Sequence, residues 1–150
     1  MTRNLAFFIA LIATAIALGA ALAHLLELPN KIHLPADEYL VVQKAYRGWN
    51  KLAFLLLLEL ASMIWLAVLY WAEPAVRWPV ITALACLIAA QAIFWAFTYR
   101  ANIATSNWTA IPANWQTLRI RWEYSHNAGA LFQLGAMSAL IIAVLSRRGV

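Results

Sequence analysis

Charge is scarce in this 150-residue sequence, and cysteine is almost absent. Charged residues make up 11% of the chain, against about 25% in soluble globular domains, whereas hydrophobic residues make up 65%. A chain this short cannot hide so much apolar surface from water in its own interior. The composition therefore excludes an ordinary soluble enzyme and predicts a single domain, residues 1–150, in a lipid bilayer.

The single cysteine and the net charge each exclude a class of protein. Cys86 has no partner for an internal disulfide and lies among apolar residues, so we interpret it as a small buried hydrophobic side chain. The net charge of +5 arises from Lys and Arg that flank apolar stretches. In such places these residues set the orientation of the chain and contact anionic headgroups. We expect the lipid bilayer as a partner, and no nucleic acid.

Four apolar stretches are each close to the length that crosses a bilayer, which is about 20 residues. They cover residues 5–28, 51–72, 78–99 and 128–145. In lipid each must be helical, because an open strand would leave backbone groups unpaired. The predicted fold class is all-α, an up-down four-helix bundle that crosses the membrane several times, with both termini on the same side.

The first stretch has features of a secretory signal. It begins with a basic segment, and Ala21-Leu22-Ala23 fits a signal-peptidase site. Its apolar run continues to Leu28 and is longer than a signal core of about 7–15 residues. We therefore interpret it as an uncleaved anchor.

The second and fourth helices are expected to extend beyond the membrane. Pro35 and Pro112 lie at the starts of runs that reach Ala72 and Ser146 with no further proline. Each helix would have about 36 residues and a length of about 54 Å. Both would extend on one side, here called the site side. The distribution of Lys and Arg leaves its orientation relative to the cytoplasm open.

Polar side chains recur on one face of each expected helix, at steps of three and four residues. The helical rise sorts them into two layers. The upper layer, at roughly 30–36 Å from the far ends of the helices, contains His24, Glu27, Thr98, Glu123 and His126. The deeper layer, at roughly 20–23 Å, contains Glu59, Gln91 and Gln133.

The upper layer is the candidate metal site. His24-x-x-Glu27 and Glu123-x-x-His126 each place an imidazole and a carboxylate on one helix face. Ferritin-like bundles bind two metals with paired Glu-x-x-His helices and further carboxylates, but here only Glu59 is available and it lies too deep. One iron, copper or zinc ion held by the four upper residues is simpler to build. Haem between the two histidines and no metal at all are the alternatives.

A polar and aromatic segment, residues 102–126, forms a cap over the upper layer. Helix capping and interfacial Trp anchors account for it in the simplest interpretation. The alternative is the lid and mouth of a pocket that admits a flat, hydrophobic molecule from the membrane. The residues expected to bind such a substrate are Glu59, Gln91, Trp95, Thr98, Asn102, Thr105, Asn107, Trp108 and Trp122.

Two motifs resemble a bacterial family of small four-span membrane proteins with a domain of unknown function, with which the anthrone oxygenases are grouped. The first motif is Asn102-x-x-Thr105-x-Asn107-Trp108 followed by Pro112-x-x-Trp115-x-x-x-Arg119-x-x-Trp122-Glu123-x-x-His126. The second, Ala23–Lys31 with Tyr39, Gln43 and Tyr46-Arg47-Gly48, is similar to a subgroup. The expected location is a bacterial inner membrane.

The resemblance implies an activity. Anthrone oxygenases oxidise an aromatic methylene to a quinone with dioxygen and are thought to need no metal. If this chain shares that chemistry, the resemblance implies that His24, Glu27, Glu123 or His126 acts as a base that removes a proton from an acidic C–H.

Two function hypotheses follow. The first is an oxidoreductase or oxygenase acting on a hydrophobic aromatic or quinone-like molecule, with Arg119 and Asn107 stabilising a developing oxyanion. Its catalytic residues would be His24, Glu27, Glu123, His126 and Arg119. The second is a non-catalytic subunit or binding module of a membrane complex or homo-oligomer. There the polar layer would be structural, with Arg119 or Arg121 neutralising the carboxylates.

Overall fold

The computed structural model describes residues 1–147. Within this range the chain forms helices and no strand. Four helical stretches are long and apolar enough to cross a membrane: Thr2–Lys31, Trp49–Leu69, Pro74–Ala104 and Trp115–Leu145. The prediction of an all-α protein with four apolar spans is confirmed at this level. In three cases the helical stretch extends beyond the predicted apolar span of residues 5–28, 78–99 or 128–145.

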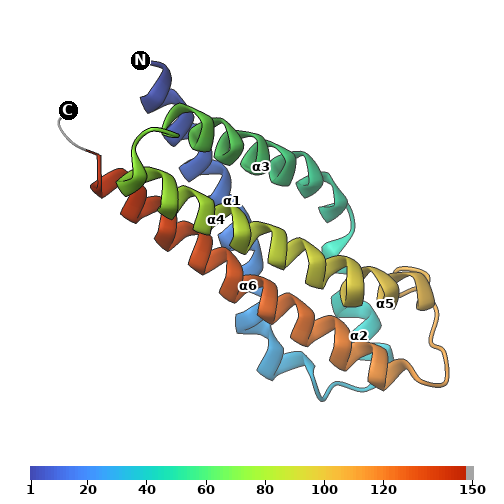
Figure 1. The fold of residues 1–150 in the computed structure, drawn as a ribbon. Helices are drawn as coiled ribbons and strands as arrows, with labels where there is room; N and C mark the ends of the chain where they lie inside the picture. The colour runs from blue at the N-terminus through green and yellow to red at the C-terminus, as the bar shows by residue number, and fades with distance from the viewer. Residues whose placement is uncertain (148–150) are drawn as a thin grey trace.

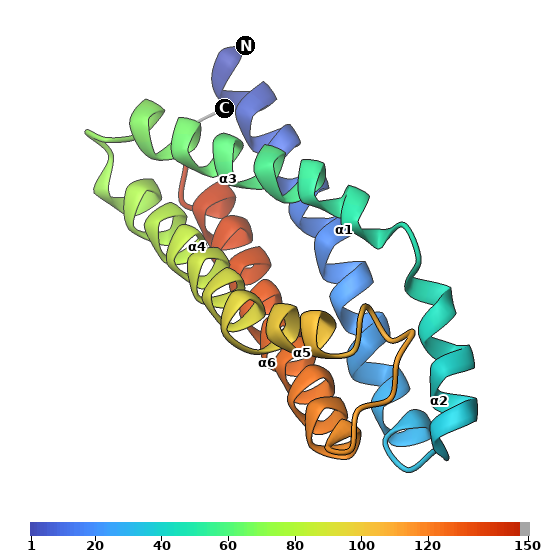
Figure 2. The ribbon, with the colours of Figure 1, turned by 90° about the vertical axis from the view of Figure 1, so that its right-hand side faces the viewer.

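The four long helices lie side by side (Figures 1 and 2). α1 (Thr2–Lys31) packs against α3 (Leu52–Leu69) and α6 (Trp115–Leu145), and α4 (Pro74–Ile93) packs against α3 and α6. Small side chains let the helices approach closely. The fully buried core between them includes Ala6, Ala10, Met63, Leu66, Val80, Ala83, Ala136, Leu140 and Ala143. The first turn of α1 and the end of α6 meet, because Arg147 Nη1 donates to Asn4 Oδ1 at 2.8 Å.

α1 continues beyond the point where the sequence predicts its end. Pro29 lies inside the helix, which runs on to Lys31. Proline lacks an N–H and is disfavoured in the interior of a helix, so Pro29 suggests that the helix ends before it. The helix nevertheless continues through Pro29. As a result Lys31 lies one helical turn after Glu27, on the same face.

The prediction of one continuous helix from residue 35 to residue 72 is wrong. Arg47 is extended, with ψ 126°, and Gly48 has φ +87°, in the left-handed region that glycine adopts readily. This turn bends the chain, so the segment before it lies beside the site-side end of α1 (Figure 2). That segment comprises α2 (Ala36–Gln43) and the 3-10 turn η1 (Lys44–Tyr46), and a second 3-10 turn, η2 (Trp49–Lys51), leads into α3.

The third span changes its helical form near the site side. α4 passes into a π-helical segment, η3 (Phe94–Thr98), and then into α5 (Tyr99–Ala104). Single π turns inside α-helices are rare and often occur at functional sites. The last helix begins at Trp115 rather than at Pro112, and at 31 residues it is shorter than predicted.

A strained turn follows α5. Ser106, Asn107 and Trp108 have φ angles of 50°, 56° and 60°, which non-glycine residues seldom adopt in succession. The Thr105 hydroxyl holds the turn, because it accepts the Trp108 N–H at 3.1 Å and donates to the Ala101 carbonyl oxygen at 2.8 Å. The turn buries the Trp108 ring beneath the loop.

Candidate functional site

A buried lysine joins two carboxylates at the site-side end of α1 and α6. The Lys31 side chain is 3% exposed, and its Nζ lies 3.2 Å from Glu27 Oε2 and 3.4 Å from Glu123 Oε2. The same amine donates to Tyr46 Oη at 2.6 Å. An amine buried in this way is stable only because it is paired.

Two tyrosines complete what we call the Lys31 cluster: Glu27, Lys31, Tyr39, Tyr46 and Glu123. Tyr39 of α2 donates to Glu123 Oε1 at 2.8 Å, and Tyr46 of η1 donates to Glu27 Oε2. Burial raises the pKa of Tyr39 far above its ordinary value, and the nearby Glu123 carboxylate raises it further. Burial and the hydrogen bond to Glu27 also raise the pKa of Tyr46. Both hydroxyls are therefore protonated donors at neutral pH.

Arg119 has different partners from those predicted. Its Nη1 donates to the Leu34 carbonyl oxygen at 2.7 Å, and its guanidinium lies over the rings of Tyr39 and Trp115. It therefore attaches α6 to the connection that follows α1. The prediction that Arg119 or Arg121 neutralises the carboxylates is wrong, because Lys31 is the cation that contacts both.

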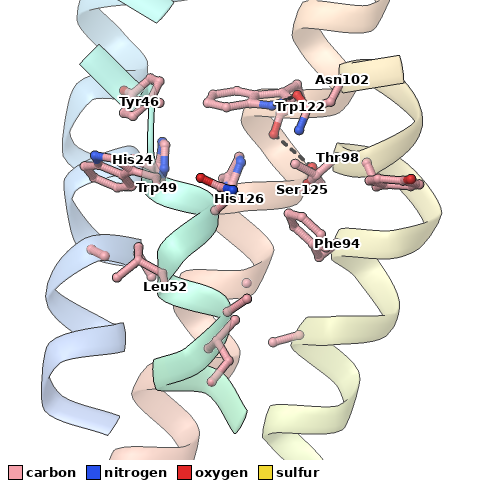
Figure 3. A pocket seen from close by; sticks show the side chains of 18 of the residues that line it. His24, Tyr46, Trp49, Leu52, Phe94, Thr98, Asn102, Trp122, Ser125 and His126 are labelled. Carbon is pink, nitrogen blue, oxygen red and sulfur yellow. Dashed lines mark hydrogen bonds between the residues drawn. The ribbon is translucent and has the colours of Figure 1, made fainter. Parts of the chain in front are cut away.

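The two histidines of the predicted upper layer face each other from α1 and α6 (Figure 3). The rings of His24 and His126 are stacked, with centroids 4.0 Å apart and planes inclined by 18°. Trp122 meets His126 edge to face at 4.2 Å, and Tyr46 lies 4.5 Å from His24. The aromatic neighbours hold both imidazoles in place.

One nitrogen of each imidazole is orphaned. Across residues 1–147, His24 Nδ1 and His126 Nε2 are buried and find no hydrogen-bond partner. Leaving such an atom unpaired costs about 1–3 kcal/mol. These nitrogens are two of ten buried side-chain atoms without a partner among the described residues. What distinguishes them is that they lie on facing rings, in the wall of one cavity.

The histidine pair forms part of the wall of a cavity of about 740 Å³, which we call the central cavity. Segments from α1, η1 to α3, α4 to α5, and α6 surround it, and Figure 3 shows several of its side chains. Seven of the residues predicted to bind a substrate line it: Gln91, Trp95, Thr98, Asn102, Asn107, Trp108 and Trp122. The cavity walls are predominantly aromatic and aliphatic, with a few polar groups between them.

Two predicted substrate-binding residues lie outside this lining. Glu59 is fully buried behind Gln133, whose Nε2 donates to Glu59 Oε2 at 3.1 Å. Thr105 is also fully buried and uses its hydroxyl in the strained turn. Both residues support the wall, because Gln133 and Trp108, their hydrogen-bonding partners, contact the cavity.

Asn102 orients the indole rings on one side of the central cavity. Its Oδ1 accepts hydrogen bonds from Trp122 Nε1 at 2.8 Å and from Trp108 Nε1 at 3.2 Å. Below it, the hydroxyls of Thr98 and Ser125 are 2.6 Å apart and link η3 to α6. The motif that carries the family resemblance therefore shapes one wall of the cavity.

Two glutamines add orphaned atoms to the same lining. Gln43 Nε2 and Gln133 Oε1 are buried without a partner among the described residues. Gln133 is seven positions beyond His126 on α6, which is about 10 Å along the helix axis. The cavity thus offers polar atoms at several heights along its length.

The four residues predicted to share a metal belong to two separate arrangements. Glu27 and Glu123 are bound by the lysine and tyrosines of the Lys31 cluster, whereas His24 and His126 stack on each other. Within residues 1–147 no group of three or more His, Cys, Asp or Glu side chains is placed to hold a metal ion. This geometry gives no support to the shared metal site.

Three residues of the Lys31 cluster are missing from the predicted site: Lys31, Tyr39 and Tyr46. All three belong to the second motif of the family resemblance, which was the available signal. The spacing of Glu27 and Lys31 is a signal for an ion pair on one helix face, but Pro29 between them suggests that the helix has ended. The prediction of one continuous helix over residues 35–72 would place both tyrosines on an extension beyond the bundle, away from the carboxylates.

Comparison with models of protein families, with curated proteins and with solved structures finds no match to this chain. Function is therefore argued from the chemistry of the site. The central cavity combines an apolar volume, two imidazoles in its wall and several unpaired polar atoms, which suits the binding of a small molecule.

Proposed function

We propose that the protein is an integral membrane oxidoreductase or oxygenase that binds a flat, hydrophobic aromatic or quinone-like molecule in the central cavity. One observation carries this proposal. Four side chains that each have a buried, orphaned polar atom line this single cavity: His24, Gln43, His126 and Gln133. A largely apolar pocket with a few convergent polar groups is typical of small-molecule sites.

The rim of the cavity favours access from the bilayer. Trp95 and Tyr99 line the cavity and are 56% and 42% exposed. Both lie in the stretch Pro74–Ala104, which is long and apolar enough to span a membrane. A hydrophobic molecule dissolved in lipid would reach the histidines by this route without crossing water.

The proposed chemistry begins with proton transfer. A neutral imidazole of His126 or His24 accepts a proton from an acidic methylene of the bound molecule, and the carbanion reacts with dioxygen. The methylene and one dioxygen yield a carbonyl and one water, so no further reductant is consumed. This is the reaction of the anthrone oxygenases that the sequence resembles.

The Lys31 cluster changes the roles proposed for the carboxylates. Glu27 and Glu123 already have cationic and hydroxyl partners, so they act in this scheme as positioning residues that hold α1 against α6. The histidines alone of the original catalytic set contact the cavity.

A non-catalytic binding module is the second candidate, and the completeness of the Lys31 cluster favours it. Each carboxylate of the cluster has an ion-pair contact with Lys31 and a tyrosine hydroxyl donor, as a structural role in helix packing requires. The cavity would then hold its ligand without turnover. Activity measurements distinguish the two candidates.

The experiment uses the purified full chain in lipid nanodiscs, with anthrone as the substrate. Oxygen consumption and the absorbance of anthraquinone report turnover, and quenching of tryptophan fluorescence reports binding. General-base catalysis contributes about 10²–10⁴-fold, so His126→Gln should lower turnover by about 100-fold or more. His33→Gln is the matched control, because His33 is exposed and outside the cavity.

The outcomes separate the candidates. Turnover that survives in both His24→Gln and His126→Gln would rule out the histidine mechanism. Binding of anthrone without turnover in the wild type would favour the binding module. Absence of both would overturn the assignment of the ligand class.

We also propose the finer topology, an up-down bundle in a bacterial inner membrane with both termini on one side. The contact between Arg147 and Asn4 supports this arrangement, because it brings the two ends of the chain together. Reporter fusions at each terminus should give the same sidedness. Opposite sidedness would contradict the topology.

A further inference from the structure

A second, smaller pocket of about 250 Å³ lies on the outer surface, away from the central cavity. It is formed where η3 and α5 meet α6. Its lining consists of Ala96, Phe97, Arg100, Ala101, Leu118 and Arg121. Four apolar side chains therefore make a groove that two guanidinium groups flank.

The two arginines are not engaged by the protein. The salt bridges of residues 1–147 involve Arg3 and Lys31 as cations, and neither Arg100 nor Arg121 has a carboxylate within 4.0 Å. Both side chains are exposed. In contrast, Arg119 on the same helix is buried and bound to the Leu34 carbonyl oxygen. The pocket thus carries two positive charges without a counter-ion from the described chain.

The position of the pocket favours a lipid headgroup as the counter-ion of Arg100 and Arg121. Arg100 lies near the site-side end of the third span, four residues before its last residue, Ala104, and Phe97, one turn earlier, is 49% exposed. Tyr99 and Trp95, also exposed, are side chains typical of the membrane–water boundary. The groove therefore begins among headgroups and continues towards hydrocarbon.

We propose that this pocket binds an anionic phospholipid. Its phosphate lies between Arg100 and Arg121, and an acyl chain follows the apolar floor along Phe97 and Leu118. Guanidinium groups bind phosphate through paired hydrogen bonds, and basic pockets between transmembrane helices recognise acidic headgroups. Inorganic phosphate shares the chemistry of the headgroup, but it would leave the apolar floor uncovered. This inference is independent of the activity proposed for the central cavity.

The test is native mass spectrometry of the delipidated full chain in detergent, titrated with phosphatidylglycerol or phosphatidylcholine. We expect phosphatidylglycerol to bind at least tenfold more tightly. The double variant Arg100→Gln/Arg121→Gln should lose this preference, since each arginine near a headgroup is worth about fivefold in affinity. Arg77→Gln/Arg147→Gln removes the same charge at the opposite end of the bundle and should keep the preference within twofold.

Two further arms make the result decisive. Ala96→Leu narrows the groove at an exposed position without changing any charge, and it should weaken phosphatidylglycerol at least threefold. Inorganic phosphate at millimolar concentration should not displace the lipid. If both double variants lose the preference for phosphatidylglycerol to the same extent, the preference arises from net charge alone, and the proposal is overturned. Displacement by inorganic phosphate would also overturn it, in favour of a soluble anion site.

Discussion

The Lys31 cluster and the histidine pair are neighbours on the same two helices, yet they differ in how far their polar atoms have partners. Glu123 Oε2 accepts no hydrogen bond but lies 3.4 Å from the Lys31 ammonium, whereas the orphaned histidine nitrogens have no such contact. In the cluster, the lysine and both tyrosines are bound to Glu27 or Glu123. In the pair, His24 and His126 contact each other through ring faces and each has an orphaned nitrogen. Satisfied polar groups stabilise a fold, whereas orphaned ones cost stability. The first region is therefore structural and the second is available to a ligand.

The largest expected effect comes from removing the central cation. Lys31→Met leaves Glu123 as a fully buried carboxylate with no cation beside it. Breaking a buried ion pair from one side costs about 3–5 kcal/mol, so we expect a loss of this size in the free energy of unfolding in mixed micelles. Lys44→Met, at an exposed position of η1, should cost less than about 0.5 kcal/mol. Similar losses in the two variants would show that the cluster is not structural.

A smaller loss is expected when the cluster keeps its charges but loses a donor. Tyr39→Phe removes the hydroxyl that binds Glu123 Oε1 and should destabilise the protein by about 1–3 kcal/mol. Tyr124→Phe provides the matched control, because Tyr124 is 57% exposed on α6. If both variants unfold at the same denaturant midpoint, the hydrogen bond contributes nothing measurable.

The pH dependence of unfolding at alkaline pH provides a second test of the contribution of Tyr39 to stability. The pKa of Tyr39 is raised in the folded state above its unfolded value of about 10. Its contribution is therefore complete below pH 10 and is lost as the pH rises further, by up to about 1.4 kcal/mol per pH unit. Unfolding measured from pH 9 to 12 should be less steeply pH-dependent in Tyr39→Phe. Equal slopes would mean that Tyr39 ionises freely in the folded protein.

The smallest effect on stability is expected at the histidine pair. His24→Phe and His126→Phe replace an orphaned nitrogen with an apolar ring, so each should change the free energy of unfolding by less than about 1 kcal/mol. Binding of anthrone, followed by tryptophan fluorescence, should nevertheless weaken at least tenfold. His33→Phe should alter neither quantity. A loss of stability as large as that of Lys31→Met would erase the contrast between the two regions.

Much of the fold follows from hydropathy and helical periodicity. The four apolar spans, the placement of His24 and His126 at matched heights, and the polar faces towards the bundle all come from spacing alone. Two local conformations escape this reasoning. Pro29 is tolerated inside α1, and Gly48 ends a run that has no proline to mark its end. A glycine in a left-handed turn and a glycine within a helix look the same in a sequence.

The sequence predicted many of the residues of the candidate site, but it did not predict which of them contact each other. The motif residues Asn102, Asn107 and Trp122 line the cavity. The counter-ion of the carboxylates was not predictable, because several cations lie at similar heights and side-chain reach decides among them. Arg119 reaches a backbone carbonyl, and Lys31 reaches both carboxylates.

By itself, the sequence determined that this chain is helical and apolar enough for a membrane, and that two histidines and two glutamates lie near the same end of two helices. These properties depend on composition and on the 3.6-residue period of the helix, which can be read from each helical segment without its neighbours. Only the tertiary structure decided that the glutamates bind a lysine while the histidines face a cavity. That division depends on the bend at Gly48, which places α2 and η1 beside the bundle and brings Tyr39 and Tyr46 to the carboxylates. The imidazoles stack on each other and each keeps one nitrogen without a partner among the described residues.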